Sequence, residues 1–140
     1  MSKRDPSTAF ICLQTPNDIL SYCAAFLEKT SDGVLLIDED GQIIFWNRAM
    51  ETIFAIKSSE ALGVKAWDIH TLLANQSFEN EDIIDKIRTD ITRALHSGEA
   101  NWMKGTLEQE IIDRNSQQRY VQFSFFPIET VRGFMIVYST

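Results

Sequence analysis

Residues 31–51 read SDGVLLIDEDGQIIFWNRAME, and this stretch decides the fold. Two apolar runs flank an acidic turn that ends in an Asp-Gly step at Gly41. Such a step is typical of a β-hairpin, because glycine accepts positive φ at no steric cost. Asn47 follows the second run directly and is suited to cap a helix, since its side-chain oxygen can accept an unpaired N–H of the first turn. The stretch therefore predicts two strands, residues 33–38 and 42–46, that lead straight into a helix.

Further helices are predicted on both sides of this stretch. Residues 15–30 have the apolar spacing of an amphipathic helix. Residues 81–97 show the same spacing in a longer helix, with acidic residues near its positive end and Gly98 just beyond its last turn. We expect its buried stripe to consist of Ile84, Ile87, Ile91 and Leu95. Two short helical turns are predicted between the hairpin and the long helix, at residues 58–63 and 67–73.

Three more strands are predicted after the long helix. They cover residues 102–112, 120–126 and 134–138, with a polar turn at residues 113–117. Because each set of strands is consecutive and hairpin-linked, an antiparallel sheet is favoured over a parallel one. The sequence therefore predicts an α+β fold, in which a five-stranded antiparallel sheet carries short helices and one long helix on one face. An N-terminal amphipathic helix precedes this unit.

The hairpin stretch strongly resembles the opening of a PAS domain. The positions that agree with the pattern of that family are Asp32, Gly33, Gly41, Asn47 and Ala49. A second match, SEALGV at residues 59–64, resembles the turn that follows at the expected distance. The resemblance covers residues 31–138 and implies a PAS domain at residues 31–140. Residues 1–30 would then form a tail and a flanking helix, through which such domains often dimerise.

Composition and charge restrict the partners of the chain. The formal net charge is −7 and the basic residues are scattered singly, so we expect no direct binding of nucleic acid. No apolar run approaches the roughly 18 residues that a membrane-spanning helix needs, and we expect no membrane insertion. Cys12 and Cys23 lie in apolar contexts and are interpreted as buried free thiols, which indicates a reducing, cytoplasmic location.

The resemblance raises the question of a cofactor. The flavin photoreceptor type uses a cysteine between the short helices and the long helix, and residues 58–97 contain none. The haem type takes an axial histidine from the inward face of the long helix, whereas His96 lies opposite the apolar stripe. We therefore expect no cofactor. Haem bound through His70 and a non-covalently bound flavin are the less favoured alternatives.

A ligand would lie between the inner face of the sheet and the short helices. The residues expected to border this pocket are Trp67, His70, Phe78, Ile84, Ile87, Ile91, Trp102 and Phe123. Bulky residues such as Phe78, Trp102 and Phe125 can also fill the space and close it. No catalytic or metal-binding set is recognisable, because the sequence has no P-loop, G-x-S-x-G or H-E-x-x-H motif. A small cavity enzyme would need a buried Asp or Glu, and the last two strands offer none.

Two functions from different classes follow from these observations. In the favoured one, a small ligand binds in the core and a homodimer relays the signal to a downstream output domain. The resemblance implies that this output is a histidine kinase of a bacterial two-component system or a diguanylate cyclase. In the other, the domain is a ligand-free dimerisation or docking module. The chain ends at its last strand, where the family continues into a signalling helix, so we expect an output domain beyond residue 140.

Overall fold

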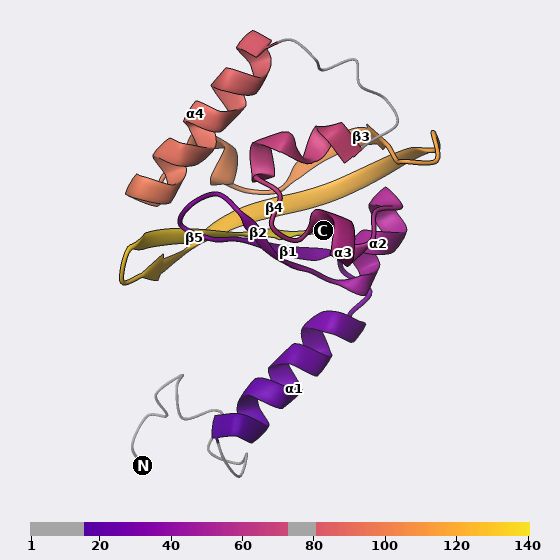
Figure 1. Cartoon of the computed structure of the whole chain (residues 1–140), viewed down its shortest axis with the longest axis vertical. Coiled ribbons are helices and arrows are strands. Elements are labelled where there is room, and N and C mark those ends of the chain that lie inside the picture. The colour runs from indigo at the N-terminus through magenta and orange to yellow at the C-terminus, as the bar shows by residue number, and fades with distance from the viewer. Residues whose placement is uncertain (1–15, 73–80) are drawn as a thin grey trace.

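The five strands of the chain form one antiparallel sheet. A computed structural model describes residues 16–72 and 81–140. The order of the strands across the sheet is β2-β1-β5-β4-β3 (Figure 1). The strands are β1 Val34–Ile37, β2 Ile43–Trp46, β3 Leu107–Ile112, β4 Gln118–Thr130 and β5 Gly133–Ser139. The predicted α+β fold with a five-stranded antiparallel sheet is confirmed.

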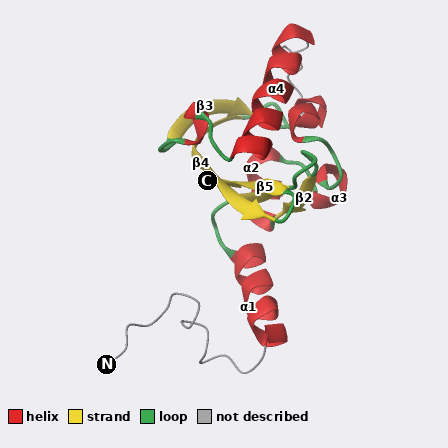
Figure 2. Cartoon of the chain, turned by 90° about the vertical axis from the view of Figure 1, so that its left-hand side faces the viewer, coloured by secondary structure: helices red, strands yellow, loops and turns green. Residues whose placement is uncertain are grey.

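The helices lie on both sides of this sheet. They are α1 Pro16–Lys29, α2 Arg48–Phe54, α3 Ser58–Ala61 and α4 Glu81–Ser97, with the 3₁₀ helices η2 Ala66–Leu72 and η3 Asn101–Met103. The long helix α4 covers one face of the sheet, whereas α1 extends away on the opposite side (Figures 1 and 2). The bounds of α4 agree with the predicted long helix.

The core lies between the sheet and the helices on its inner face. The register pairs Leu35 with Tyr138 and Ile37 with Ile136, which places these four side chains on one face because paired residues point to the same side. Ile136 is fully buried and packs in a cluster with Leu95 of α4. Burial of each such aliphatic side chain contributes about 1.5–3 kcal/mol. The strand register and α4 together therefore define the inner face on which a ligand site can form.

Asn47 is fully buried and joins four segments of the chain. Its Oδ1 accepts hydrogen bonds of 3.0 Å from the main-chain N–H of Val34 and from that of Met50. Its Nδ2 donates to the main-chain carbonyl of Leu27 at 2.7 Å and to that of Asp32 at 2.9 Å. The predicted N-cap of α2 is confirmed. The same side chain also fastens the end of α1 to the start of β1.

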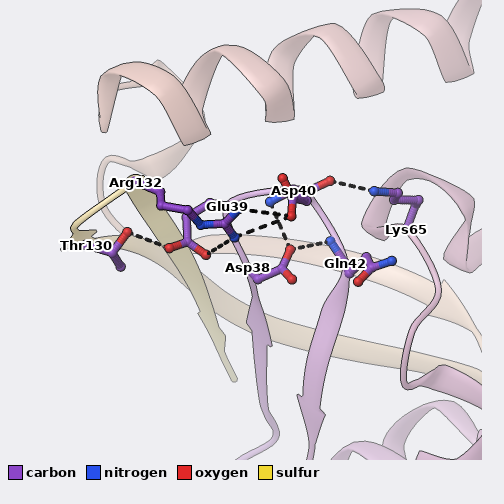
Figure 3. Close-up of polar contacts among 7 residues, drawn as sticks. All are labelled: Asp38, Glu39, Asp40, Gln42, Lys65, Thr130 and Arg132. Atoms are coloured by element: carbon purple, nitrogen blue, oxygen red, sulfur yellow. Dashed lines mark hydrogen bonds and ion pairs between the residues drawn. The ribbon is translucent and has the colours of Figure 1, made fainter.

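The acidic turn between β1 and β2 is held against the turn between β4 and β5 (Figure 3). Asp38 Oδ1 accepts the N–H of Asp40 at 2.9 Å, as expected for an Asx turn. Glu39 accepts the hydroxyl of Thr130 at 2.7 Å. Arg132 lies 3.1 Å from a carboxylate oxygen of Glu39 and 3.4 Å from one of Asp40. The carboxylates of this turn therefore have structural partners.

Two predicted strand boundaries were wrong. Trp102 lies in η3 and not in a strand, because Gly105, at φ +76°, redirects the chain just before β3. In contrast, β4 continues past its predicted end through Pro127. Since β3 pairs with β4 only as far as Phe123, this half of β4 is an edge where a proline without an N–H is tolerated.

Two predicted buried positions are exposed. Cys23 is exposed because α1 stands clear of the core, so its thiol is free but not buried; Cys12 lies outside the described residues. Ile87 belongs to the expected buried stripe of α4 but is 40% exposed, because it borders an open depression on this side of the sheet. Leu95 is buried as expected, and Ile91 is half-buried.

Candidate functional site

An inner cavity of about 170 Å³ lies between the sheet and the helices that cover it. It is lined by Leu35, Ile37, Ile43, Trp46, Met50, Phe54, Ala66, Ile69, Ile91, Phe125 and Tyr138. These residues come from β1, β2, β4, β5, α2, η2 and α4, so nearly every element of the domain contributes to the wall. The lining is apolar apart from the indole N–H of Trp46 and the hydroxyl of Tyr138. The cavity therefore suits a small ligand that has little polar surface.

The described residues of this lining expose almost no polar surface to the cavity. The indole N–H of Trp46 already donates to the carbonyl of Ile56 at 2.9 Å. The hydroxyl of Tyr138 makes no hydrogen bond within the described ranges 16–72 and 81–140, and burial raises the pKa of Tyr138. The phenol therefore stays neutral at physiological pH and can donate one hydrogen bond.

A second depression, the outer hollow, adjoins the inner cavity and has a volume of about 350 Å³. The two share Ile37, Ile91 and Phe125. The Phe125 ring lies edge-on to Trp102, with ring centres 5.0 Å apart and planes at 89°. It is also edge-on to Phe123, at 5.6 Å and 87°. Phe125 thus stands between the enclosed cavity and the more open hollow.

The structure brings half of the predicted pocket residues together. Those that line the outer hollow are Ile87, Ile91, Trp102 and Phe123. Of these, only Ile91 also lines the inner cavity. Ile84 is half-buried on α4 and lines neither space. Phe78 lies outside the described residues.

Two further predicted residues, Trp67 and His70, lie apart from both spaces. The Trp67 ring covers Gly41 so closely that a Cβ there would lie 2.4 Å from a ring carbon. His70 Nδ1 lies 3.1 Å from the carbonyl oxygen of Trp67, within its own helical turn. Both residues therefore have local structural contacts.

The predicted pocket set contains only Ile91 of the eleven residues that line the inner cavity, and the ten that it missed include Leu35, Met50 and Tyr138. The apolar alternation of β5 and the helical spacing around Met50 indicate that these side chains face the core. The sequence does not reveal that Leu35 pairs with Tyr138, because this pairing joins the strands β1 and β5, which are far apart along the chain.

The cofactors considered from the sequence do not fit these residues. Haem needs an axial ligand, but His70 faces its own turn and His96 is exposed on α4. The polar edge atoms of a flavin ring need several hydrogen-bond partners, whereas the described residues that line the two spaces supply only the polar side chains of Tyr138, Gln109 and Asp90 in addition to the engaged Trp46. Within the described residues, no three His, Cys, Asp or Glu side chains are placed to hold a metal ion.

One buried carboxylate is present, but it belongs to a turn. Asp113 is 1% exposed and its Oδ1 accepts the N–H of Asn115 and that of Gln117, both at 2.9 Å. Its Oδ2 lies 3.0 Å from Arg119 Nε. The hydrogen bond from Gln117 foremost, and then Arg119, lower the pKa of Asp113. It lines neither the inner cavity nor the outer hollow, so it does not supply the acid that a cavity enzyme would need.

The comparisons with known proteins agree with this architecture. The model of the PAS fold matches residues 27–139. No curated protein sequence matches the chain. In the part of the chain that the structure describes, no helix combines the length and apolarity needed to cross a bilayer.

Several solved structures are similar in fold. The PAS domain of a protein from Colwellia psychrerythraea is 18% identical, with a TM-score of 0.58 over 87% of this chain and 95% of that chain. The PAS domain of an HTR-like protein from Haloarcula marismortui is also 18% identical, with a TM-score of 0.59 over 89% and 92%. The PAS domain of nitrogen regulation protein NR(II) from Vibrio parahaemolyticus is 16% identical, with a TM-score of 0.52 over 84% and 94%. At these identities the likeness concerns the fold alone.

Proposed function

The chain belongs to the PAS fold family, whose members are generally non-catalytic sensory modules, and we propose that this domain binds a small, largely apolar ligand in its inner cavity. The observation that carries the proposal is the apolar wall of this cavity, to which β1, β2, β4, β5, α2, η2 and α4 all contribute. Burial of apolar surface supplies the affinity in this proposal. Residues 31–140 form the sensing unit in this proposal, and the helix before it is the relay.

A short series of contacts leads from the cavity to both ends of the domain. Met50 lines the cavity, and its N–H is bonded to Asn47, whose amide holds the carbonyl of Leu27 in α1. The sulfur of Met50 also lies against Gly33, because a Cβ on Gly33 would be 2.7 Å away from it. The N–H of Gly33 donates to the hydroxyl of Thr140 at 2.6 Å. A ligand that shifts Met50 thereby biases α1 and the end of β5 together.

Helix α1 is the element through which we propose that the chain dimerises. Leu20, Tyr22 and Phe26 are between 60% and 69% exposed, and the helix stands clear of its own domain (Figure 2). Tyr22 and Phe26 are four residues apart and therefore share one face of the helix. Exposed large apolar side chains of this kind are typical of a surface that a partner covers. A second copy of the chain is the occupant, as the flanking position of α1 in this family favours. A change in helix packing then reaches an output domain of the kinase or diguanylate cyclase type.

We also propose that the protein is located in the cytoplasm. Cys23 carries a free thiol on an exposed surface, which suits a reducing compartment. The second candidate function is a ligand-free docking module. The small volume of the inner cavity, about 170 Å³, favours it, because modest side-chain movement closes a space of that size.

Native mass spectrometry of the protein purified from cells, paired with an absorption spectrum, tests the proposal. We expect a bound mass in the wild type and its loss in Ala66→Phe, which fills the inner cavity. Thr71→Phe on the exposed side of the same 3₁₀ helix is the matched control and keeps the bound mass. If no sample carries a bound mass and no added apolar compound binds, the ligand-free docking module becomes the favoured function.

A further inference from the structure

A third depression, the charged hollow, lies beside the outer hollow and has a volume of about 520 Å³. Its walls come from α4 and from the segment around η3. The charged residues that line it are Lys86, Asp90, Arg93, Glu99 and Lys104. Asn101 and Trp102 also line it and add an amide and an indole ring.

The charged hollow is continuous with the apolar spaces described above. Asp90 and Trp102 line both the charged hollow and the outer hollow. The outer hollow shares Phe125 with the inner cavity. Because Trp102 is held edge-on against Phe125, its ring forms the boundary between the charged and the apolar side. A ligand with an apolar body and a polar end can therefore contact both sides at once.

Among the described residues, no carboxylate forms an ion pair with the cations of the charged hollow. Lys86, Asp90 and Arg93 share one face of α4 by their spacing. Even so, none of Lys86, Arg93 and Lys104 lies within ion-pair distance of a carboxylate in residues 16–72 and 81–140. Arg88 on the same helix does form an ion pair. The three cations are thus available to an anionic group of a ligand.

We propose that the ligand of this domain is an amphipathic monocarboxylate, with its apolar body in the outer hollow and inner cavity and its carboxylate in the charged hollow. The inference rests on the function proposed above and names the chemical class of the ligand. Arg93 and Lys104 bind the carboxylate, and Trp102 covers the junction between head and body. The charge balance selects a single negative charge, because three cations and two carboxylates leave one net positive charge in the lining. A dianionic phosphate head would leave a negative charge without a counter-charge.

Decanoate and decan-1-ol form a matched pair of probes, since they differ only in the charged head. Isothermal titration below the micellar range measures their affinities for the wild type and for Arg93→Glu, Lys104→Glu and Asp90→Asn. Arg88→Glu is the control, because it makes the same charge change on the same helix outside the hollow. The indole N–H resonances of Trp46 and Trp102 report which space is filled.

We expect decanoate to bind the wild type about tenfold more tightly than decan-1-ol, which corresponds to about 1.4 kcal/mol. Arg93→Glu and Lys104→Glu abolish this preference without weakening decan-1-ol, Asp90→Asn increases it, and Arg88→Glu leaves it unchanged. Both probes shift the resonances of Trp46 and Trp102, because Trp102 also lines the outer hollow, and decanoate shifts that of Trp102 further.

Equal affinities of the two probes in the wild type would overturn the carboxylate assignment while leaving the apolar sensor in place. Equal losses in Arg93→Glu and Arg88→Glu would also overturn it, because the effect would then be a general one of net charge. Failure of both probes to bind would remove the ligand-binding function together with the inference.

Discussion

The side-chain amide of Asn47 donates a 2.7 Å hydrogen bond to the main-chain carbonyl of Leu27. This bond joins the sensing domain to α1, which otherwise contacts the domain mainly at α2. The same side chain caps α2, so the helix that carries Met50 and the helix proposed to dimerise are fastened to one buried group. A movement of α1 or of α2 therefore changes the hydrogen bonds that Asn47 makes with both helices.

Asn47→Asp tests this junction. The acid keeps the acceptor for α2 but loses both donors and places a carboxylate beside the carbonyls of Leu27 and Asp32. Each buried polar group left unpaired costs about 1–3 kcal/mol, so urea unfolding should show a loss of about 2–4 kcal/mol. Hydrogen exchange in α1 should speed up more than in β5. Exposed Asn101→Asp is the control, and an equal loss in both variants would contradict the assignment.

Gly33→Ala tests the contact between β1 and α2. The added Cβ would lie 2.7 Å from Met50 Sδ and 3.2 Å from Thr140 Cγ2, so the methionine has to move. We expect a destabilisation of about 1–3 kcal/mol, in the range of overpacked cores. In the double variant with Met50→Ala the two costs should be less than additive, because the clash disappears. Additive costs in thermal unfolding would show that the two residues do not press on each other.

Tyr138→Phe tests the effect of burial on the phenol of Tyr138, a residue that lines the inner cavity. Burial raises the pKa of Tyr138 in the folded state, so its stabilising contribution is complete below the unfolded value of about 10 and is lost as pH rises above it. The stability of the wild type should therefore fall more steeply above pH 10 than that of the variant. Exposed Tyr120→Phe is the control and should follow the wild type. Below pH 9 the stability of Tyr138→Phe should stay within about 0.5 kcal/mol of wild type, because no hydrogen bond is lost.

The contacts of Glu39 in the turn of Figure 3 lead to a prediction about the pKa of its carboxyl group. The hydroxyl of Thr130 foremost, and then the main chain and Arg132, lower the pKa of Glu39. Stability from this group is therefore present above its unfolded pKa and is lost as pH falls through the lower folded value. Titration of the Glu39 carboxyl carbon by NMR should show a larger rise toward the ordinary value in Thr130→Val than in Arg132→Ala. The reverse order would mean that the ion pair dominates.

The proposed dimer can be tested on α1. Phe26→Glu places a charge on the exposed face of α1 that Phe26 shares with Tyr22, and it should convert a dimer into a monomer in analytical ultracentrifugation. Lys29→Glu is the control, since Lys29 is exposed on the last turn of the same helix. A wild type that stays monomeric at high concentration would remove the dimer from the mechanism.

The sequence alone determined the local features of this protein. The Asp-Gly step before Gln42, the cap at Asn47 and the bounds of α4 all follow from contacts within a few residues, and all agree with the structure. Such features are readable because turn conformation and helix capping depend on near neighbours along the chain. The order of elements and the fold family followed from them.

The tertiary structure alone decided the site. Whether Leu35 faces Tyr138 depends on a register between strands at opposite ends of the chain, and a shift of one residue would turn either side chain to the other face. The exposure of Cys23 depends on whether α1 lies on the domain or away from it, and its apolar spacing is the same in both cases. Cavities are what packing leaves unfilled, so their positions follow from every neighbouring side chain together and from no single segment of sequence.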